Sequence, residues 1–143
     1  MDRVLLHNGM HPSFKLVYGY LAYYMHLNDP KVIRMIRYVY KGKGVIYIIR
    51  NTVTGMLYVG STLSPSLRFH DHLVNHNTNA ALQSAISHDG QSKFVIYIMQ
   101  EVVFPAGLSF NEKLNHLRVV EQSYMDKYHA DQLYNLIRSS IQS

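Results

Sequence analysis

The sequence of 143 residues contains no cysteine and has few charged residues, 16% of the chain. Without cysteine, neither a disulfide framework nor a thiolate metal site can form, so any metal would be held by oxygen or imidazole ligands. The hydrophobic fraction of 48% excludes a disordered chain and predicts a folded core. At this length we expect one compact domain, with room for an appendage.

Long apolar runs are also missing. The most apolar stretch, residues 16–27, is interrupted by Gly19 and His26 and falls short of the roughly 20 residues that a membrane helix needs, so no membrane span is predicted. The N-terminal residues show neither the apolar core of a secretory signal nor the Ser/Arg-rich pattern of a transit peptide. If the protein works inside an organelle, we therefore expect it to be made there.

The positive charge is concentrated in the first third of the chain. Residues 1–43 carry a net charge of +5, whereas residues 44–143 contain seven basic and seven acidic side chains. A basic segment of this kind can contact the phosphates of a nucleic acid, or it can be an ordinary solvated face, and charge alone leaves both open. The candidate nucleic-acid-binding residues are Lys31, Arg34, Arg37, Lys41 and Lys43.

Two helices are predicted within residues 1–43. Residues 14–27 have tyrosines at helical spacing, which we expect in the core. Asp29 is a helix N-cap with Pro30 at the first helical position, and it predicts a helix over residues 31–40. The glycines at 42 and 44 end this helix. We therefore divide the chain into a basic, tyrosine-rich helical extension, residues 1–43, and a second unit, residues 44–143.

From residue 45 the pattern changes to short strands. Residues 45–50 and 56–60 predict a hairpin around a turn at residues 51–55, and residues 94–102 predict a third strand. Helices are expected over residues 64–75, 79–87 and 111–128, with a short closing element at residues 133–137. Three strands mixed with helices, without βαβ regularity, predict an α+β fold.

Several polar side chains stand at positions where they can meet. The hairpin can set Tyr47 and Tyr58 side by side, and Arg68 and His72 share a helix face with His76. Glu121 lies in an otherwise apolar helical stretch, which makes it a candidate for an inward-turned carboxylate. Asn135 follows at the close of the domain.

Taken singly, each of these residues has an ordinary structural explanation. The tyrosines would be half-buried strand residues, Arg68 and His72 exposed helix residues, and Asn135 a turn or cap residue. Glu121 would pair with Arg118 or Lys127. A zinc site on His72 and His76, spaced by one helical turn, is a further alternative.

The same residue types suit phosphodiester hydrolysis. A carboxylate can hold a hard divalent cation, a guanidinium complements charge on phosphoryl oxygens, and tyrosine or histidine can orient or deprotonate water.

Taken together, these residues resemble the GIY-YIG nuclease family. Val45-Ile46-Tyr47 and Tyr58-Val59-Gly60 look like its two named motifs, although Val45 replaces the first glycine and Gly44 stands one position earlier. The segment that begins at Glu121 and the pair Tyr134-Asn135 resemble its later motifs, and residues 79–86 and 94–98 are similar to organellar intron-encoded members. The likeness covers about residues 44–138.

The resemblance implies a small three-stranded antiparallel sheet flanked by helices and a metal-dependent nuclease activity. Glu121 would hold one Mg²⁺ or Mn²⁺, Arg68 would bind the scissile phosphate, and Asn135 would help place the substrate. Tyr47, Tyr58 and His72 would share the positioning and activation of water, with the general base left open. The full predicted catalytic set is Tyr47, Tyr58, Arg68, His72, Glu121 and Asn135.

The sequence is compatible with two functions, one an enzyme and the other a structural nucleic-acid-binding subunit. The first is a homing-type endonuclease acting on DNA, or on RNA, in mitochondria. Homing members usually attach a DNA-recognition region after the nuclease domain, and here only eight residues follow Asn135. We expect residues 1–43 to supply binding instead, or to dock the domain on a partner. The second function is a catalytically retired domain that serves as a structural RNA- or DNA-binding subunit of an organellar ribonucleoprotein such as a mitochondrial ribosome.

Overall fold

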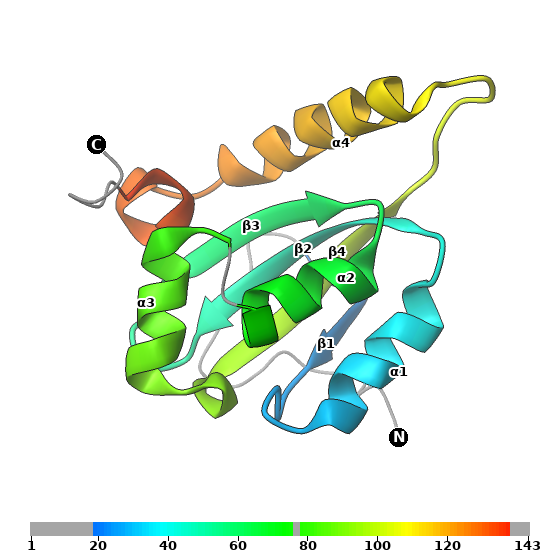
Figure 1. The fold of residues 1–143 in the computed structure, drawn as a ribbon. Coiled ribbons are helices and arrows are strands. Elements are labelled where there is room, and N and C mark those ends of the chain that lie inside the picture. The colour runs from blue at the N-terminus through cyan, green and yellow to red at the C-terminus, as the bar shows by residue number, and fades with distance from the viewer. Residues whose placement is uncertain (1–18, 76–77, 138–143) are drawn as a thin grey trace.

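The computed structural model describes residues 19–75 and 78–137. They form a four-stranded antiparallel sheet in the order β1-β4-β2-β3, built from β1 (Ala22–Tyr24), β2 (Gly44–Asn51), β3 (Leu57–Thr62) and β4 (Phe94–Val102). The helices α1 (Pro30–Tyr40), α2 (Pro65–His70) and α3 (Ala80–Asp89) cover one face, and α4 (Phe110–Met125) lies on the other, beside β3 (Figure 1). The predicted mixed class with an antiparallel sheet is confirmed, but the predicted number of strands, three, is wrong.

The additional strand is β1, which lies where the sequence predicted a helix over residues 14–27. Ala22, Tyr23 and Tyr24 pair with Ile98, Tyr97 and Ile96 of β4. This pairing satisfies the backbone of β1 and turns Tyr24 into the core, whereas helical spacing of the tyrosines was the only signal available locally. The helix prediction is therefore wrong for the residues described, and residues 14–18 lie outside them.

The predicted hairpin of β2 and β3 is confirmed. Asn51 closes β2, and its side-chain Oδ1 accepts a hydrogen bond from the backbone N–H of Val53 at 2.8 Å. Gly55 adopts a φ of 82°, a left-handed conformation that favours glycine and lets the chain reverse. The hairpin thereby places β3 at the edge of the sheet.

Local capping explains where the helices begin. The side chain of Asp29 accepts a hydrogen bond from the backbone N–H of Lys31, with Pro30 following as predicted. Asn79 caps α3 through the N–H of Leu82, and Ser109 and Glu112 form a capping box at α4. Beyond α2 the chain continues as a π-helix, η1 (Asp71–Asn75), in place of the α-helical turn that we predicted.

The closing element and the long helix lie close to their predicted positions. Helix α4 ends at Met125, before the predicted end at residue 128, and the chain closes with 3₁₀ turns at Ala130–Gln132 and Tyr134–Leu136.

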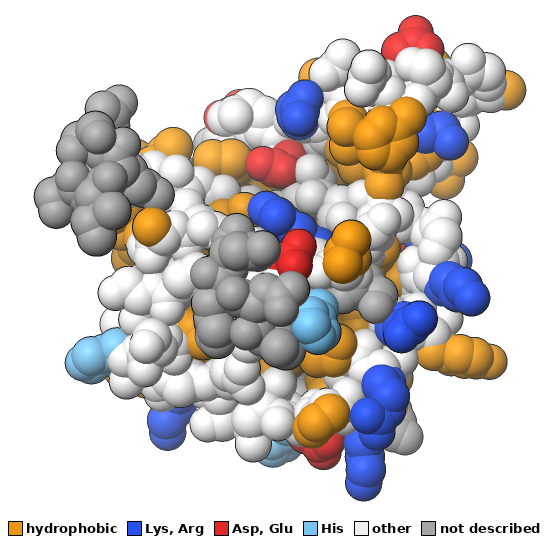
Figure 2. All heavy atoms as spheres, viewed as in Figure 1, with side chains coloured by type: hydrophobic (Ala, Val, Ile, Leu, Met, Phe, Trp, Pro, Cys, Tyr) orange, Lys and Arg blue, Asp and Glu red, His pale blue; other side chains and the backbone are white. Residues whose placement is uncertain are grey.

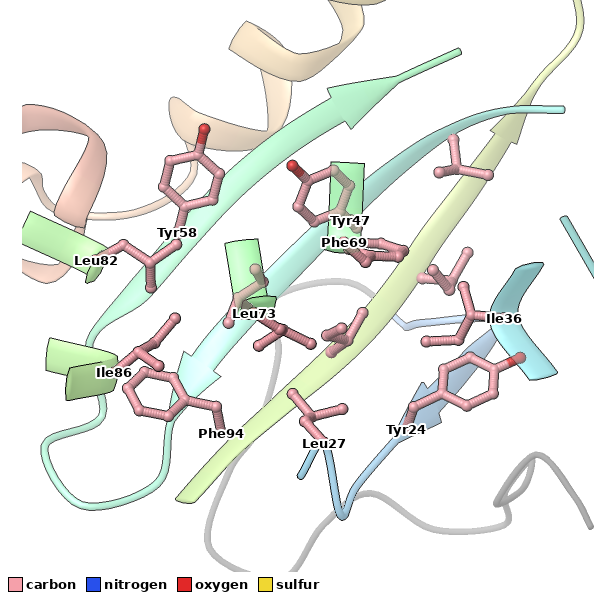
Figure 3. Close-up of a cluster of buried hydrophobic side chains, with 14 of the residues drawn as sticks. Tyr24, Leu27, Ile36, Tyr47, Tyr58, Phe69, Leu73, Leu82, Ile86 and Phe94 are labelled. Atoms are coloured by element: carbon pink, nitrogen blue, oxygen red, sulfur yellow. The ribbon is translucent and has the colours of Figure 1, made fainter. Parts of the chain in front are cut away.

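The sheet separates two apolar clusters. β2 is buried along its whole length, because alternate side chains enter the cluster under α1–α3 and the cluster under α4. Figure 3 shows the first cluster, in which Phe69 and Leu73 pack between Tyr47 and the remaining core residues. Each fully buried large apolar side chain contributes about 1.5–3 kcal/mol to folding. This packing fixes β2 and β3 as a rigid platform.

Helix α1 shares the first cluster. Its Ile36 and Tyr40 are buried there, and the ring of Tyr40 meets that of Tyr24 edge to face at 6.4 Å. Within the described residues, no helix has the length and apolarity to cross a membrane.

Candidate active site

Two tyrosines of the hairpin form the base of the candidate site. Tyr47 of β2 lies opposite Gly60 of β3, and Tyr58 lies opposite Ile49, so the phenols are diagonal neighbours. Their ring centroids are 6.3 Å apart, and both hydroxyls point away from the apolar cluster toward the same side (Figure 3). The prediction that the hairpin would bring these two phenols together is confirmed.

Gly60 makes this arrangement possible. A Cβ atom at position 60 would lie 2.4 Å from Cζ and 2.5 Å from the hydroxyl oxygen of Tyr47, closer than real Cβ contacts. The Tyr47 ring therefore lies across the backbone of Gly60. The sequence shows a glycine at position 60. It does not show that this glycine contacts the ring of Tyr47, thirteen positions earlier.

His72 is a buried partner of Tyr47. Its ring is fully buried, with Nε2 2.7 Å from the Tyr47 hydroxyl and Nδ1 2.8 Å from Oγ1 of Thr78. The Thr78 hydroxyl in turn accepts a hydrogen bond from Nε2 of Gln83. Burial, together with the charge of Arg68, lowers the pKa of His72 to about 3, so the imidazole is neutral.

The burial and the two hydrogen bonds of His72 decide between its alternative interpretations. The interpretation as a solvated helix residue is wrong. The alternative of a zinc pair also has little support, because both imidazole nitrogens already have partners, and His76 lies outside the described residues. Thr78 and Gln83 were not predicted. Thr78 lies just before α3 and Gln83 on α3, and no periodic spacing reveals that Thr78 joins them to His72.

Arg68 of α2 projects toward both phenols. Burial raises the pKa of Tyr47 and of Tyr58, and the charge and hydrogen bonds of Arg68 partly oppose this increase. Both phenols are therefore protonated at neutral pH. Tyr47 is fully buried and Tyr58 is 9% exposed, so Tyr58 is the more accessible residue of the two.

Glu121 reaches the same site from α4. Its Oε1 accepts a hydrogen bond of 2.6 Å from the Ser61 hydroxyl, directly after Gly60 on β3. Burial raises the pKa of Glu121, whereas the Ser61 bond and the charges of Arg68 and Arg118 lower it. The prediction of an inward-turned carboxylate is confirmed. The salt bridges found in the described part of the chain do not include Glu121, so the alternative of an ion pair with Arg118 or Lys127 is not supported.

Asn135 holds the strand that carries Tyr58. Its Oδ1 accepts from the backbone N–H of Val59 at 3.0 Å, and its Nδ2 donates to the carbonyl of the same residue at 2.7 Å. The side chain thus satisfies the exposed edge of β3 as a neighbouring strand would. The preceding Tyr134 accepts a hydrogen bond from Asn51 at its hydroxyl, which ties the closing segment to the hairpin turn. Asn135 lies in the 3₁₀ turn Tyr134–Leu136, as the alternative of a turn residue expected, but its side chain binds the backbone of β3.

The donor set fits a hard divalent cation bound largely through water and substrate. Within residues 19–75 and 78–137 no group of three or more acidic, His or Cys side chains is placed to hold a metal. Mg²⁺ and Mn²⁺ often bind with one or two carboxylates, water and substrate phosphate, so a single carboxylate suffices. Glu121 supplies one carboxylate, and its raised pKa shows a burial cost that a cation would offset.

The predicted nucleic-acid-binding residues lie on α1 or just beyond it. Arg34, Arg37 and Lys41 are exposed on the side that faces α2, and Lys31 is exposed near the start of α1. Lys43 forms a salt bridge of 3.5 Å with Glu101. Their role in binding stays a prediction.

Fold and site together describe a catalytic domain built on a β-hairpin, and the family comparison agrees with them. Residues 43–135 match the model of the GIY-YIG catalytic domain, so this chain belongs to the GIY-YIG nuclease family. All six residues predicted for the site lie within the matched region. The resemblance inferred from the motifs is confirmed.

One curated relative from a fungus is also similar to the chain. It is named probable intron-encoded endonuclease 1 of Neurospora crassa, and it is 34% identical over 110 residues, which cover 77% of this chain. The match spans 35% of the relative, so the chain corresponds to about a third of that protein. No solved structure gives a significant match.

Proposed function

We propose that this protein is a metal-dependent endonuclease that hydrolyses DNA phosphodiester bonds. The observation that carries the proposal is the convergence of two neutral phenols, Arg68 and the half-buried Glu121 beside the edge strand β3. These groups provide donors for phosphoryl oxygens and a ligand for a cation on one surface, which phosphodiester hydrolysis requires.

Each side chain has a role that its surroundings support. Glu121 would hold one Mg²⁺ or Mn²⁺, with its orientation fixed by Ser61. When bound, such an ion polarises the scissile phosphate and stabilises the leaving oxygen. Arg68 would donate its guanidinium hydrogen bonds to the phosphoryl oxygens, where negative charge develops. Tyr58, the more exposed phenol, would contact the substrate or the attacking water directly.

The Tyr47–His72 contact orients the second phenol. In the free protein the raised pKa of Tyr47 and the low pKa of His72, about 3, both oppose transfer of the phenol proton to the imidazole. The pair therefore holds Tyr47 in place, with its hydroxyl beside Arg68. Asn135 contributes to substrate placement by fixing β3.

The proposal extends to a homing-type role in mitochondria. It is supported by the similarity to the intron-encoded relative, and the resemblance of residues 79–86 and 94–98 to organellar intron-encoded members agrees with it. A nuclease substrate implies contact with nucleic acid, and the excess of positive charge in residues 1–43 agrees with it.

The experiment is the nicking of supercoiled plasmid by the purified protein with Mg²⁺ or Mn²⁺, with an EDTA control. Glu121→Gln should reduce the cleavage rate by at least about 100-fold, because it removes the charge that holds the cation. Glu101→Gln is the matched control, since Glu101 is an exposed acid that pairs with Lys43, and it should cleave like the unaltered protein.

Metal binding can be followed without cleavage. Titration with Mn²⁺ monitored by electron paramagnetic resonance should show one site in the unaltered protein and its loss in Glu121→Gln. If Glu121→Gln cleaves and binds Mn²⁺ normally, Glu121 is not the metal ligand. If the unaltered protein binds DNA or RNA but cleaves neither, the alternative of a retired, structural domain is favoured, and an RNA substrate in parallel decides between the two nucleic acids.

A further inference from the structure

A groove runs between α1 and α2, beside the candidate active site. It has a volume of about 750 Å³ and fifteen lining residues, none of which is Asp or Glu. One wall is α1 with Arg34 and Arg37, followed by Lys41 at the C-cap of the helix. The opposite wall carries Leu67 and His70 of α2.

The two cations of α1 and the cation at its C-cap form a short charged row. Spacings of three and four residues place Arg34, Arg37 and Lys41 on the same side of the helix, over a length of about 10 Å. All three side chains are exposed. The salt bridges found among the described residues do not involve them, so their charges are available to a ligand.

The groove and the candidate active site share α2 as a wall. Leu67 and His70 line the groove. Arg68, next to Leu67 in the chain, forms hydrogen bonds with the phenols of the site. Figure 2 shows that Lys and Arg side chains gather over α1, and that further basic side chains lie toward α4 on the same face. A polyanion held at Arg68 can therefore continue across α2 into the groove.

We propose that the groove between α1 and α2 binds the sugar–phosphate backbone of the nucleic acid beside the cleaved bond. Arg34, Arg37 and Lys41 contact phosphates, and the apolar wall at Leu63 and Leu67 packs against sugar carbons. Helix α1 lies outside the matched region, residues 43–135, so this contact surface is added to the catalytic domain by the preceding segment. The inference rests on the proposed function, but binding can be measured without cleavage.

An acidic amphipathic segment of a protein is the competing occupant, because it too would match cations and an apolar wall. The shared wall with Arg68 favours nucleic acid, since one continuous polyanion then contacts both places. A protein segment would contact the groove alone.

The first test measures binding to a labelled DNA duplex in EDTA, over a series of salt concentrations, by fluorescence anisotropy. The variant Arg34→Gln/Arg37→Gln/Lys41→Gln removes the charged row. If all three contact phosphates, the slope of log K against log salt should fall by about 2.7, which means that the unaltered protein loses about 40-fold more affinity than the variant between 50 and 200 mM salt.

A matched control removes the same charge elsewhere. Lys93→Gln/Lys113→Gln/Lys127→Gln neutralises three lysines that neither line the groove nor belong to the predicted binding set, and it should keep the slope of the unaltered protein. Equal slopes for the two triple variants would overturn the proposal, because binding would then follow net charge alone. An unchanged slope in the groove variant would overturn it as well.

The second test adds a charge to the apolar wall. Leu67 is 63% exposed, so Leu67→Glu should fold normally, repel phosphates and weaken binding at least about tenfold at 50 mM salt. Val53→Glu, in the hairpin turn and 59% exposed, is the matched control and should bind like the unaltered protein. If a poly-glutamate peptide binds at the groove and leaves DNA affinity unchanged, the groove is a protein-docking site and the proposal fails.

The two proposals fail in different ways. If cleavage is lost only in Glu121→Gln and the groove variants bind normally, the proposed role of the groove is refuted and the proposed nuclease activity is retained. If binding depends on the groove but no metal-dependent cleavage occurs, the proposed nuclease activity is refuted and the proposed role of the groove in binding is retained.

Discussion

The hydroxyl oxygen of Tyr47 lies 2.7 Å from Nε2 of His72, and neither side chain is exposed to solvent. A neutral imidazole has one donor and one acceptor nitrogen, so its two partners, Tyr47 and Thr78, together determine which nitrogen carries the proton. The contact places a titratable ring in the core directly behind the candidate site. Its consequences reach both stability and activity.

The first consequence is acid sensitivity. The folded protein lowers the pKa of His72 from 6.5 to about 3, so the unfolded chain binds a proton more readily between these two values. Stability is therefore retained above pH 6.5 and decreases as the pH falls toward 3, by up to about 1.4 kcal/mol per pH unit. Urea unfolding at pH 7, 6, 5 and 4 measures this loss.

His72→Gln should flatten that pH dependence, even if the variant is less stable at pH 7. His70→Gln, which replaces an exposed histidine of α2, should keep the slope of the unaltered protein. Parallel slopes for the unaltered protein and His72→Gln would show that His72 is not the group that titrates.

A second prediction concerns the space under Tyr47. Gly60→Ala would bring Cβ to 2.4 Å from Cζ of the Tyr47 ring, so we expect a loss of about 1–3 kcal/mol in the free energy of unfolding, measured in urea. Plasmid cleavage should also decrease, because the phenol must move. Gly19→Ala is the control, since nothing lies within 4 Å of its Cβ, and it should leave the unfolding midpoint unchanged.

The clash can be assigned to Tyr47 with a double variant. In a Tyr47→Ala background, Gly60→Ala should cost much less than it does alone, because the ring is gone. Equal costs in the two backgrounds would mean that Gly60 matters for another reason.

A third prediction concerns the hydroxyl beside Glu121. The Ser61 bond lowers the pKa of Glu121, so Ser61→Ala should raise this pKa further. If ionised Glu121 holds the cation, the acid limb of the pH profile of cleavage should then move to higher pH. Ser123→Ala, an exposed serine of α4, should leave the profile in place. A uniform loss of rate at all pH values would argue against an effect on Glu121 ionisation.

A fourth prediction concerns the closing asparagine. Asn135→Ala removes two hydrogen bonds to the backbone of Val59 and leaves polar groups of the edge strand without this partner, so stability should fall by about 1–3 kcal/mol. Hydrogen exchange at the Val59 amide should accelerate along with this loss. Asn115→Ala, on the exposed face of α4, should change stability by less than about 0.5 kcal/mol. If hydrogen exchange at the Val59 amide is unaltered in Asn135→Ala, the side chain of Asn135 does not protect the backbone of β3.

Much of the architecture was predictable because its signals are local. The caps at Asp29 and Pro30, the turn at Gly55 and the β-branched run after Gly44 each act within a few residues, and the corresponding elements were found close to their predicted bounds. β1 was not predictable in this way, because three residues become a strand only when β4 offers a partner.

For the candidate site, the sequence by itself determined the identity and order of the polar residues, and the match to the family model covers them all. Tertiary structure alone decided that His72 is buried and neutral, that Ser61 orients Glu121 and that Asn135 binds backbone instead of standing free. The physical reason is that pKa, burial and hydrogen-bond partners depend on groups brought together from distant parts of the chain, whereas caps, turns and strand propensity depend on neighbours in sequence.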